Sequence, residues 1–251
     1  MQRVVIITVL GVCSSALAMA PVGSPTAILE GERFGLSFEY GQADADLVFE
    51  DAGTEDFDWR TSYAVFSMAF TERWDFYLRL GASQAEAAGF DGDWNVSWGL
   101  GTRVTAFKWD AFSWGALVQF TNLVSRFETV DEFLIDDTPL LLNTKEELDV
   151  MEYVLATGPA WQLDRLTLYG GLLVRCVTGE FTADAGLAGD QFDLDDHWDV
   201  GGYVGGRVTL FRSGTPHGCG LARADLTAEG RFTDDSTGWS VGLLLPFGGE
   251  L

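Results

Sequence analysis

Hydrophobic and polar residues alternate without a break over residues 94–106. One face of this run holds Trp, Val, Leu, Thr and Ala, and the other holds Asn, Ser, Gly, Arg and Thr. A period of two residues predicts an extended strand with one apolar and one polar face. At about 3.3 Å per residue, the run is long enough to cross a bilayer obliquely. Its polar face carries neither Lys nor Glu, so it differs from the surface of a soluble sheet.

The same alternation recurs along the chain and predicts ten strands. The connections are alternately short and long, and both termini lie on the side of the short ones. Membrane-spanning barrels have this organisation, with short periplasmic turns and long extracellular loops. The predicted strands cover residues 33–41, 61–71, 75–85, 94–106, 112–126, 150–161, 166–178, 198–210, 220–232 and 238–247. The long connections cover residues 42–60, 86–93, 128–149, 180–199 and 229–236.

The predicted fold is all-β: a transmembrane, antiparallel, up-and-down β-barrel of about ten strands, with eight and twelve strands as alternatives. A soluble barrel would alternate as well, but its exterior would carry many Lys and Glu residues. Here the polar face is rich in Gly, Ser, Thr, Tyr and Arg, which fits a narrow lumen. Tryptophans stand at the apolar strand ends, as in the aromatic girdles of membrane barrels. They are Trp94, Trp114, Trp161, Trp198 and Trp239.

The last predicted strand alternates apolar residues from Trp239 to Phe247. In this feature the chain resembles bacterial outer-membrane β-barrel proteins of the small, porin-like kind, whose final strand ends in Phe and is recognised by the barrel-assembly machinery. The resemblance covers nearly the whole mature chain as a pattern. It implies the outer membrane as location, and outer-membrane lipid and the assembly machinery as partners. Gly248-Gly249-Glu250-Leu251 follow the Phe, where that family usually stops.

The amino terminus has the features of a secretory signal peptide. Arg3 supplies the positive charge, residues 4–12 form the apolar core, and a cut after Ala18 is preferred. A cut after Ala20 is the alternative, but it would place Pro21 directly after the cleaved bond. We therefore expect a signal peptide over residues 1–18, or 1–20, and one barrel domain over residues 30–251.

The net charge of −23 excludes nucleic acid as a partner, because phosphate binding needs clustered Lys and Arg. The long connections hold 28 of the 38 acidic residues and three basic ones, so the predicted loops are strongly acidic. Ca²⁺ takes about six to eight oxygens from such groups, although charge runs are commonly solvated surface and EF-hand spacing is absent. The candidate Ca²⁺ ligands are Asp44, Asp46, Asp193 and Asp195. We predict no firm metal site and no other cofactor.

Charged residues also occur on the predicted luminal face. A filled, salt-bridged interior is expected for a barrel near eight strands, because such barrels are filled by their side chains. The alternative is a thin polar channel, which would favour cations because its mouth is acidic. The arginines are Arg79, Arg103, Arg175, Arg207, Arg223 and Arg231, and the acids are Glu39, Glu152, Asp199, Asp225 and Glu229.

One constellation resembles a catalytic site. Omptins, the outer-membrane endoproteases, are also ten-stranded and carry Asp-x-Asp in the second loop and Asp-x-His near the fourth. The chain has Asp91 and Asp93 in its second long connection, and Asp195 and His197 in its fourth. The resemblance implies His197 as base, oriented by Asp195, with the other two acids positioning a water. Because Asp is abundant in every loop, we expect a non-enzymatic barrel with a structural or surface-interaction role. A cation pore and a rim protease are the alternatives.

Overall fold

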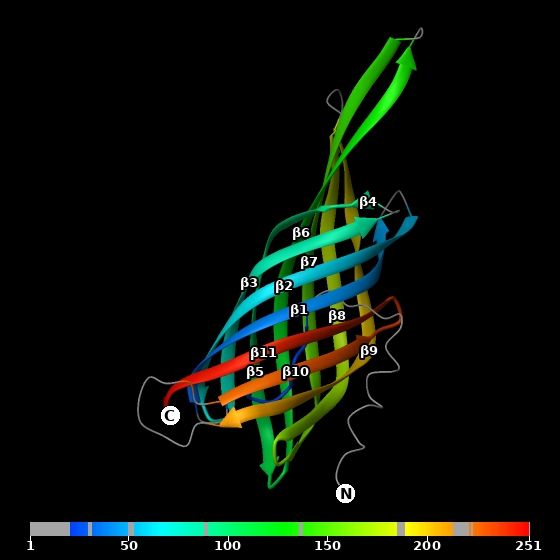
Figure 1. The fold of residues 1–251 in the computed structure, drawn as a ribbon. Coiled ribbons are helices and arrows are strands. Elements are labelled where there is room, and N and C mark those ends of the chain that lie inside the picture. The colour runs from blue at the N-terminus through cyan, green and yellow to red at the C-terminus, as the bar shows by residue number, and fades with distance from the viewer. Residues whose placement is uncertain are drawn as a thin grey trace, which may run out of the picture.

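The computed structural model describes residues 21–29, 32–49, 53–87, 90–135, 138–184, 189–212, 221 and 223–250. Ten long strands and one two-residue strand make up this part of the chain (Figure 1). The strands are β1 (Glu32–Phe49), β2 (Gly53–Thr71), β3 (Trp74–Ala87), β4 (Phe90–Asp91), β5 (Asp93–Trp109), β6 (Phe112–Ile135), β7 (Thr138–Leu163), β8 (Leu166–Asp184), β9 (Gly189–Arg212), β10 (Arg223–Phe232) and β11 (Ser236–Glu250). No helix in the described residues is long and apolar enough to cross a membrane.

The ten long strands form one closed, antiparallel ring. Each long strand pairs with the next one in the sequence, and β1 pairs with β11 to join the two ends of the chain. The short strand β4 pairs with β3 beside the ring. The predicted up-and-down barrel of ten strands is therefore confirmed, and every predicted strand lies within or largely overlaps an observed one.

The direction of the alternation is also confirmed. In β5 the tryptophans, Val96, Leu100 and Val104 face outward, whereas Ser97 and Arg103 are buried in the lumen. Exposed large apolar side chains surround the barrel on all of its long strands, and we call this belt the apolar band. Tryptophans stand near both ends of the apolar band. Alternation predicts Ala224 on the outer, apolar face of its strand, together with Leu226 and Ala228, but Ala224 is an exception. It is buried, because a register shift between Ala224 and Asp225 interrupts the alternation.

Two tight turns at the short-connection end hold their strands close together. The β5–β6 and β7–β8 strands are joined by turns whose first residues, Asp110 and Asp164, have φ values of 48° and 54°. Asp tolerates this left-handed conformation better than most residues with a Cβ atom. The neighbouring strands therefore reverse within two residues, as the short predicted connections required.

The prediction that the long connections are loops was wrong, because most of their residues continue the strands. β1 and β2 stay paired to Phe49 and Gly53, and the β6–β7 hairpin stays paired to Ile135 and Thr138, beyond the rest of the barrel (Figure 1). The predicted ends mark where the outward face stops being apolar. Backbone pairing continues past that level, since an antiparallel ladder does not need an apolar exterior.

Past the apolar band, the two faces of the strands exchange their polarity. On β1 and β2, Asp44, Asp46 and Asp58 lie on the outer face, whereas Leu47 and Trp59 point inward and are buried. We call the inward-facing apolar cluster at this end the neck. It consists of Ala45, Leu47, Phe57, Trp59, Ala85, Leu123, Phe127, Leu148, Val150, Val177 and Leu194, and Tyr63, Val65 and Tyr77 continue the same cluster into the lumen at the level of the apolar band.

The ring becomes narrower where the neck begins. The β10–β11 hairpin ends early, and beyond it β1 pairs directly with β9 through Phe49 and Leu194. The backbone of Asp46 also donates to the carbonyl of Asp235 in the turn of that short hairpin, at 3.1 Å. Leaving two strands out brings the wall toward the width that side chains alone can fill. The neck therefore closes the long-connection end of the lumen.

Candidate functional site

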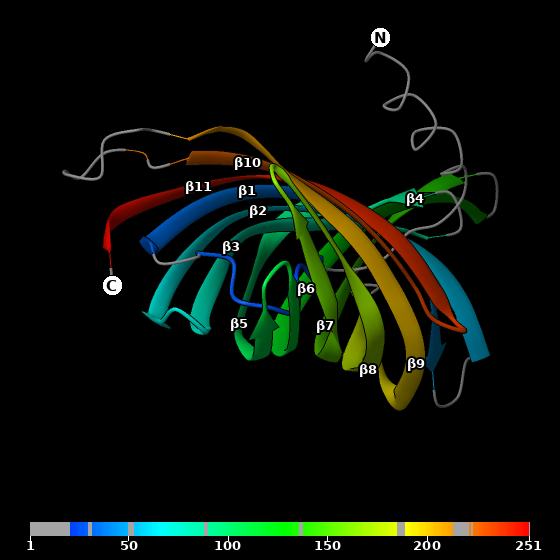
Figure 2. The same cartoon turned by 90° about the horizontal axis from the view of Figure 1, so that it is seen from below.

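The lumen is the part of the molecule where charged and polar side chains gather. Toward the short-connection end it also holds a segment of the chain that precedes β1. Residues 21–29, which we call the plug, cross the inside of the ring ahead of β1 (Figure 2). Val22 and Leu29 are at most 1% exposed. Val22 belongs to an apolar cluster with Leu117, Tyr169 and Tyr203 from three different strands. The plug thus packs into the barrel as part of its core.

Charged side chains of the wall hold the backbone of the plug at both ends. Glu229 accepts hydrogen bonds from the amides of Val22 and Gly23, at 2.7 and 2.8 Å. At the other end, Asp75 accepts from the amide of Ile28 at 2.9 Å. Bonds between amides and a carboxylate are stronger than bonds between neutral groups. These contacts fix the plug to strands on different sides of the ring.

The carbonyl of Ile28 is held by two arginines. Arg207 Nη1 donates to it at 3.1 Å, and Arg223 Nη2 donates to it as well. Both guanidinium groups also lie beside Asp225, with Arg223 Nε 2.8 Å from Oδ2. Arg207, Arg223 and Asp225 were predicted as luminal charges, and the structure brings them together under the plug.

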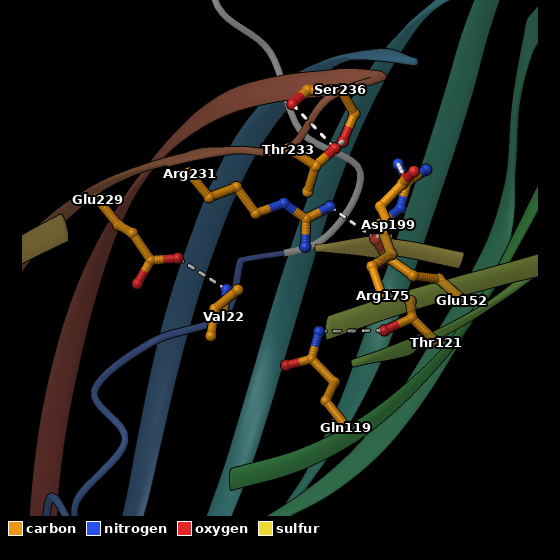
Figure 3. A network of polar contacts seen from close by, with 10 residues as sticks. All are labelled: Val22, Gln119, Thr121, Glu152, Arg175, Asp199, Glu229, Arg231, Thr233 and Ser236. Carbon is orange, nitrogen blue, oxygen red and sulfur yellow. Dashed lines mark hydrogen bonds and ion pairs between the residues drawn. The ribbon is translucent and has the colours of Figure 1, made fainter. Parts of the chain in front are cut away.

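A second polar group lies closer to the neck. Oε1 of Glu152 is 3.2 Å from Nε of Arg175 and 2.6 Å from Nη2 of Arg231 (Figure 3). Arg175 Nη1 is in turn 3.0 Å from Oδ2 of Asp199. Two cations and two anions make this group neutral, and all four side chains are buried. Buried charges arranged in this way avoid the large cost of leaving one unpaired.

Arg79 and Arg103 lie on the opposite wall of the lumen. Arg79 pairs with Glu39 at 3.2 Å, and the Arg103 guanidinium lies 4.3 Å from the centre of the Tyr77 ring. The Nε and Nη1 atoms of Arg103 are buried without a hydrogen-bond partner among the described residues. Arg103 also borders a cavity of about 40 Å³ beside Pro21. That space is large enough for water molecules, which would satisfy buried donors of this kind.

The predicted Ca²⁺ candidates lie outside the lumen. Asp44 and Asp46 stand on the outer face of β1, directly opposite Asp58 and Asp56 of β2. Partial burial and the neighbouring Asp58 raise the pKa of Asp44 from 3.8 to about 7. Among the described residues, no group of three or more His, Cys, Asp or Glu is arranged to hold a metal ion. Asp193 is exposed on β9, and the side chain of Asp195 lies outside the described part.

The four residues of the omptin-like constellation come from opposite parts of the ring. Asp91 belongs to β4 beside β3, and its carboxylate is 3.5 Å from Nη1 of Arg60. Asp93 begins β5 and is exposed. Asp195 and His197 belong to β9, which lies across the ring of ten strands from β3. At the level of Leu194, however, β9 pairs directly with β1, so that only β1 and β2 separate it from β3. The side chains of these two residues lie outside the described part, so their contacts stay a prediction.

Two features of the lumen were not anticipated from the sequence. The plug has no periodicity, no charge and two prolines, and nothing in it marks a segment that enters a barrel. Asp75 was assigned to a strand but not to the luminal charges. Its position directly after a short turn, at the start of a strand whose even-numbered residues are apolar, was the available signal.

Comparisons with known proteins identify the fold. No protein-family model matches the chain, and no curated protein matches it in sequence. Among solved structures, the translocator domain of the autotransporter NalP from Neisseria meningitidis has a TM-score of 0.52 and 12% identity, over 86% of this chain and 89% of that one. The outer membrane protease OmpT from Escherichia coli has a TM-score of 0.54 and 7% identity, over 86% and 97%. At these identities the likeness is one of fold.

Proposed function

We propose that this chain, which has the fold of bacterial outer-membrane β-barrels, is a non-enzymatic outer-membrane protein with a closed lumen. Its role lies at the cell surface, where it presents an acidic outer face to a partner or supports the envelope. The observation that carries the proposal is the double blockage of the lumen. The plug packs inside the ring through Val22 and Leu29, and the neck packs buried apolar side chains at the long-connection end.

The outer face supports the placement in a membrane. Apolar side chains such as Val96, Leu172 and Val204 are more than 60% exposed. Exposing this apolar surface costs free energy in water but not among lipid tails. β11, with its alternation from Trp239 to Phe247, forms the seam with β1. We propose this strand as the signal for the barrel-assembly machinery, and the signal peptide as the route of export.

Single-channel recording tests the proposal. The mature protein, refolded and inserted into a planar bilayer under a salt gradient, should give no steady conductance. Insertion should be verified independently, by the shift in gel mobility that folded barrels show when they are not heated. Steady, cation-selective steps from a correctly folded sample would contradict the proposal.

Such steps would support the second candidate, a narrow cation-selective pore. The acidic face around Asp44 and Asp58 favours this alternative, because negative charge at a pore mouth attracts cations. Conduction would require the plug and the neck to move together. The observed packing of Val22 and Trp59, both 0% exposed, is the argument against it.

The third candidate is an omptin-like rim protease, for which the shared fold with OmpT is the supporting observation. A basic peptide tests it directly. We expect no cleavage by the folded protein. Cleavage that is abolished in His197→Ala, while the folded fraction stays unchanged, would support this candidate and contradict a non-enzymatic role.

A further inference from the structure

The outer face carries a groove at the end of the short turns, beside the aromatic band. β5 continues beyond the β2–β3 turn. The last pair between β3 and β5 joins Trp74 to Val104, and the amide of Thr105 then donates to the carbonyl of Arg73 at 2.7 Å. The remaining residues of β5 extend past the turn without β3 beside them. This step in the wall leaves a groove of about 560 Å³.

A register shift in β5 shapes the floor of the groove. Between Thr105 and Phe107 the pairing with β6 skips one residue, and Phe107 then lies opposite Trp114. Such a bulge bends the strand and re-aims its side chains. Phe107 is 69% exposed and Trp109 is 78% exposed, so both present broad apolar surfaces to the surroundings. Together with Trp114 they form an aromatic floor.

Two cations border this aromatic floor. Arg73 comes from the β2–β3 turn and Lys108 from the end of β5, and both line the groove. Lys108 is one of only two lysines in a sequence with a net charge of −23. The nearby acids, Glu72 and Asp110, do not line the groove. They line a second cavity together with Lys108 and with luminal residues such as Thr26 and Thr105, so Lys108 borders both spaces. The groove therefore combines positive charge with apolar surface at one level of the barrel.

We propose that this groove binds an anionic glycerophospholipid of the periplasmic leaflet. Arg73 and Lys108 hold the phosphate, because guanidinium and ammonium groups are the usual phosphate donors. The acyl chains lie over Phe107, Trp109 and Trp114, at the depth where aromatic rings favour the interface. A lipid fits better than a soluble phosphate because the floor is apolar and the flanking outer face is exposed. The proposal rests on the membrane placement proposed above.

Native mass spectrometry of the folded full-length mature protein, released from micelles doped with equal amounts of phosphatidylglycerol and phosphatidylcholine, tests the site. The double variant Arg73→Gln/Lys108→Gln removes both charges. The matched control, Arg165→Gln/Arg212→Gln, removes two exposed arginines that lie in or beside the other short connections and do not line the groove. Gel mobility scores folding and insertion of every sample separately, so a failure of membrane placement is distinguished from a failure of lipid binding.

We expect one phosphatidylglycerol to be retained in preference to phosphatidylcholine. The double variant should lower this preference about 20- to 30-fold, since each cation near a lipid surface contributes about fivefold, and the control should leave it unchanged. Equal retention of both lipids, or equal loss in the two double variants, would overturn the proposal. Full displacement of phosphatidylglycerol by millimolar inorganic phosphate would also overturn it, because the site would then recognise free phosphate.

Discussion

The apolar band and the neck are built from the same strands with opposite polarity. In the band, Val96 and Leu172 face outward, and Arg175 and Glu152 face the lumen. In the neck, Trp59 and Phe127 face inward, and Asp56 and Asp58 face outward. A lipid exterior allows the charges to be inside, whereas a water exterior requires the apolar side chains to be inside. The boundary of the apolar band is the level along the strands at which the apolar face changes from outward to inward.

The largest expected effect comes from the charged group of the band. Glu152→Ala leaves Arg175 and Arg231 without their shared carboxylate oxygen, which should destabilise the barrel by about 3–5 kcal/mol. Urea unfolding in lipid vesicles measures the loss. Glu147→Ala on the same strand is the matched control. It breaks the exposed pair with Arg126, which water and salt screen, so its effect should be clearly smaller than that of Glu152→Ala. Similar losses in the two variants would mean that the lumen hydrates freely.

The neck should respond to loss of volume. Trp59→Ala removes a fully buried ring, with an expected cost of about 3–5 kcal/mol in the same unfolding assay. Phe66→Ala on the same strand faces outward and is 44% exposed. Lipid tails can fill the space it leaves, so its effect should be clearly smaller. A larger loss at Phe66 than at Trp59 would contradict the assignment of the neck as a packed core.

The plug should loosen without opening the barrel. Glu229→Ala removes the acceptor of the Val22 and Gly23 amides, at a cost of about 1–3 kcal/mol. Hydrogen exchange should become faster at these two amides, while planar-bilayer recordings stay silent because the neck remains intact. Steady conductance in this variant would show that the plug is the main barrier.

The smallest effect is expected on the outer face of β1. The raised pKa of Asp44 means that the folded state keeps a proton that the unfolded chain has released, so this residue lowers stability as pH rises from about 4 to about 7. Asp44→Asn should stabilise the protein by about 0.2–1 kcal/mol at pH 8, because it removes a like-charge pair with Asp58. The gain should vanish near pH 4. A gain independent of pH would exclude this cause.

The sequence predicted the parts of the fold where the outer face is apolar. Ten strands and their inward and outward faces follow from alternation between apolar and polar residues, as in β5. The far ends of β1 and β2 were not predicted, because their outer face is not apolar. Leu47 and Trp59 keep the same period with the opposite polarity. Alternation of either polarity therefore marks a strand, and at these ends the apolar residues face inward.

The luminal charges were predictable as a set but not as pairs. Alternation placed Arg175, Glu152 and Arg231 on the inner face, yet their meeting depends on strand stagger and ring closure, which no local pattern encodes. The plug could not be predicted at all, because its contacts with Asp75 and Glu229 join residues 47 and more than 200 positions apart. A segment without periodicity gives no sign of such partners.

The plug also ties the beginning of the chain to its last hairpin. Val22 meets Glu229 across 207 positions of sequence, and β1 meets β11 at the seam. Contacts of such long range form slowly, because the chain between them must be ordered first. The plug can meet Asp75 once β3 is present, but Val22 can meet Glu229 only after the last hairpin has arrived. Because the last hairpin supplies both Glu229 for the plug and β11 for the seam, we expect the closing of the wall and the completion of the plug's contacts to belong to the same late step of assembly.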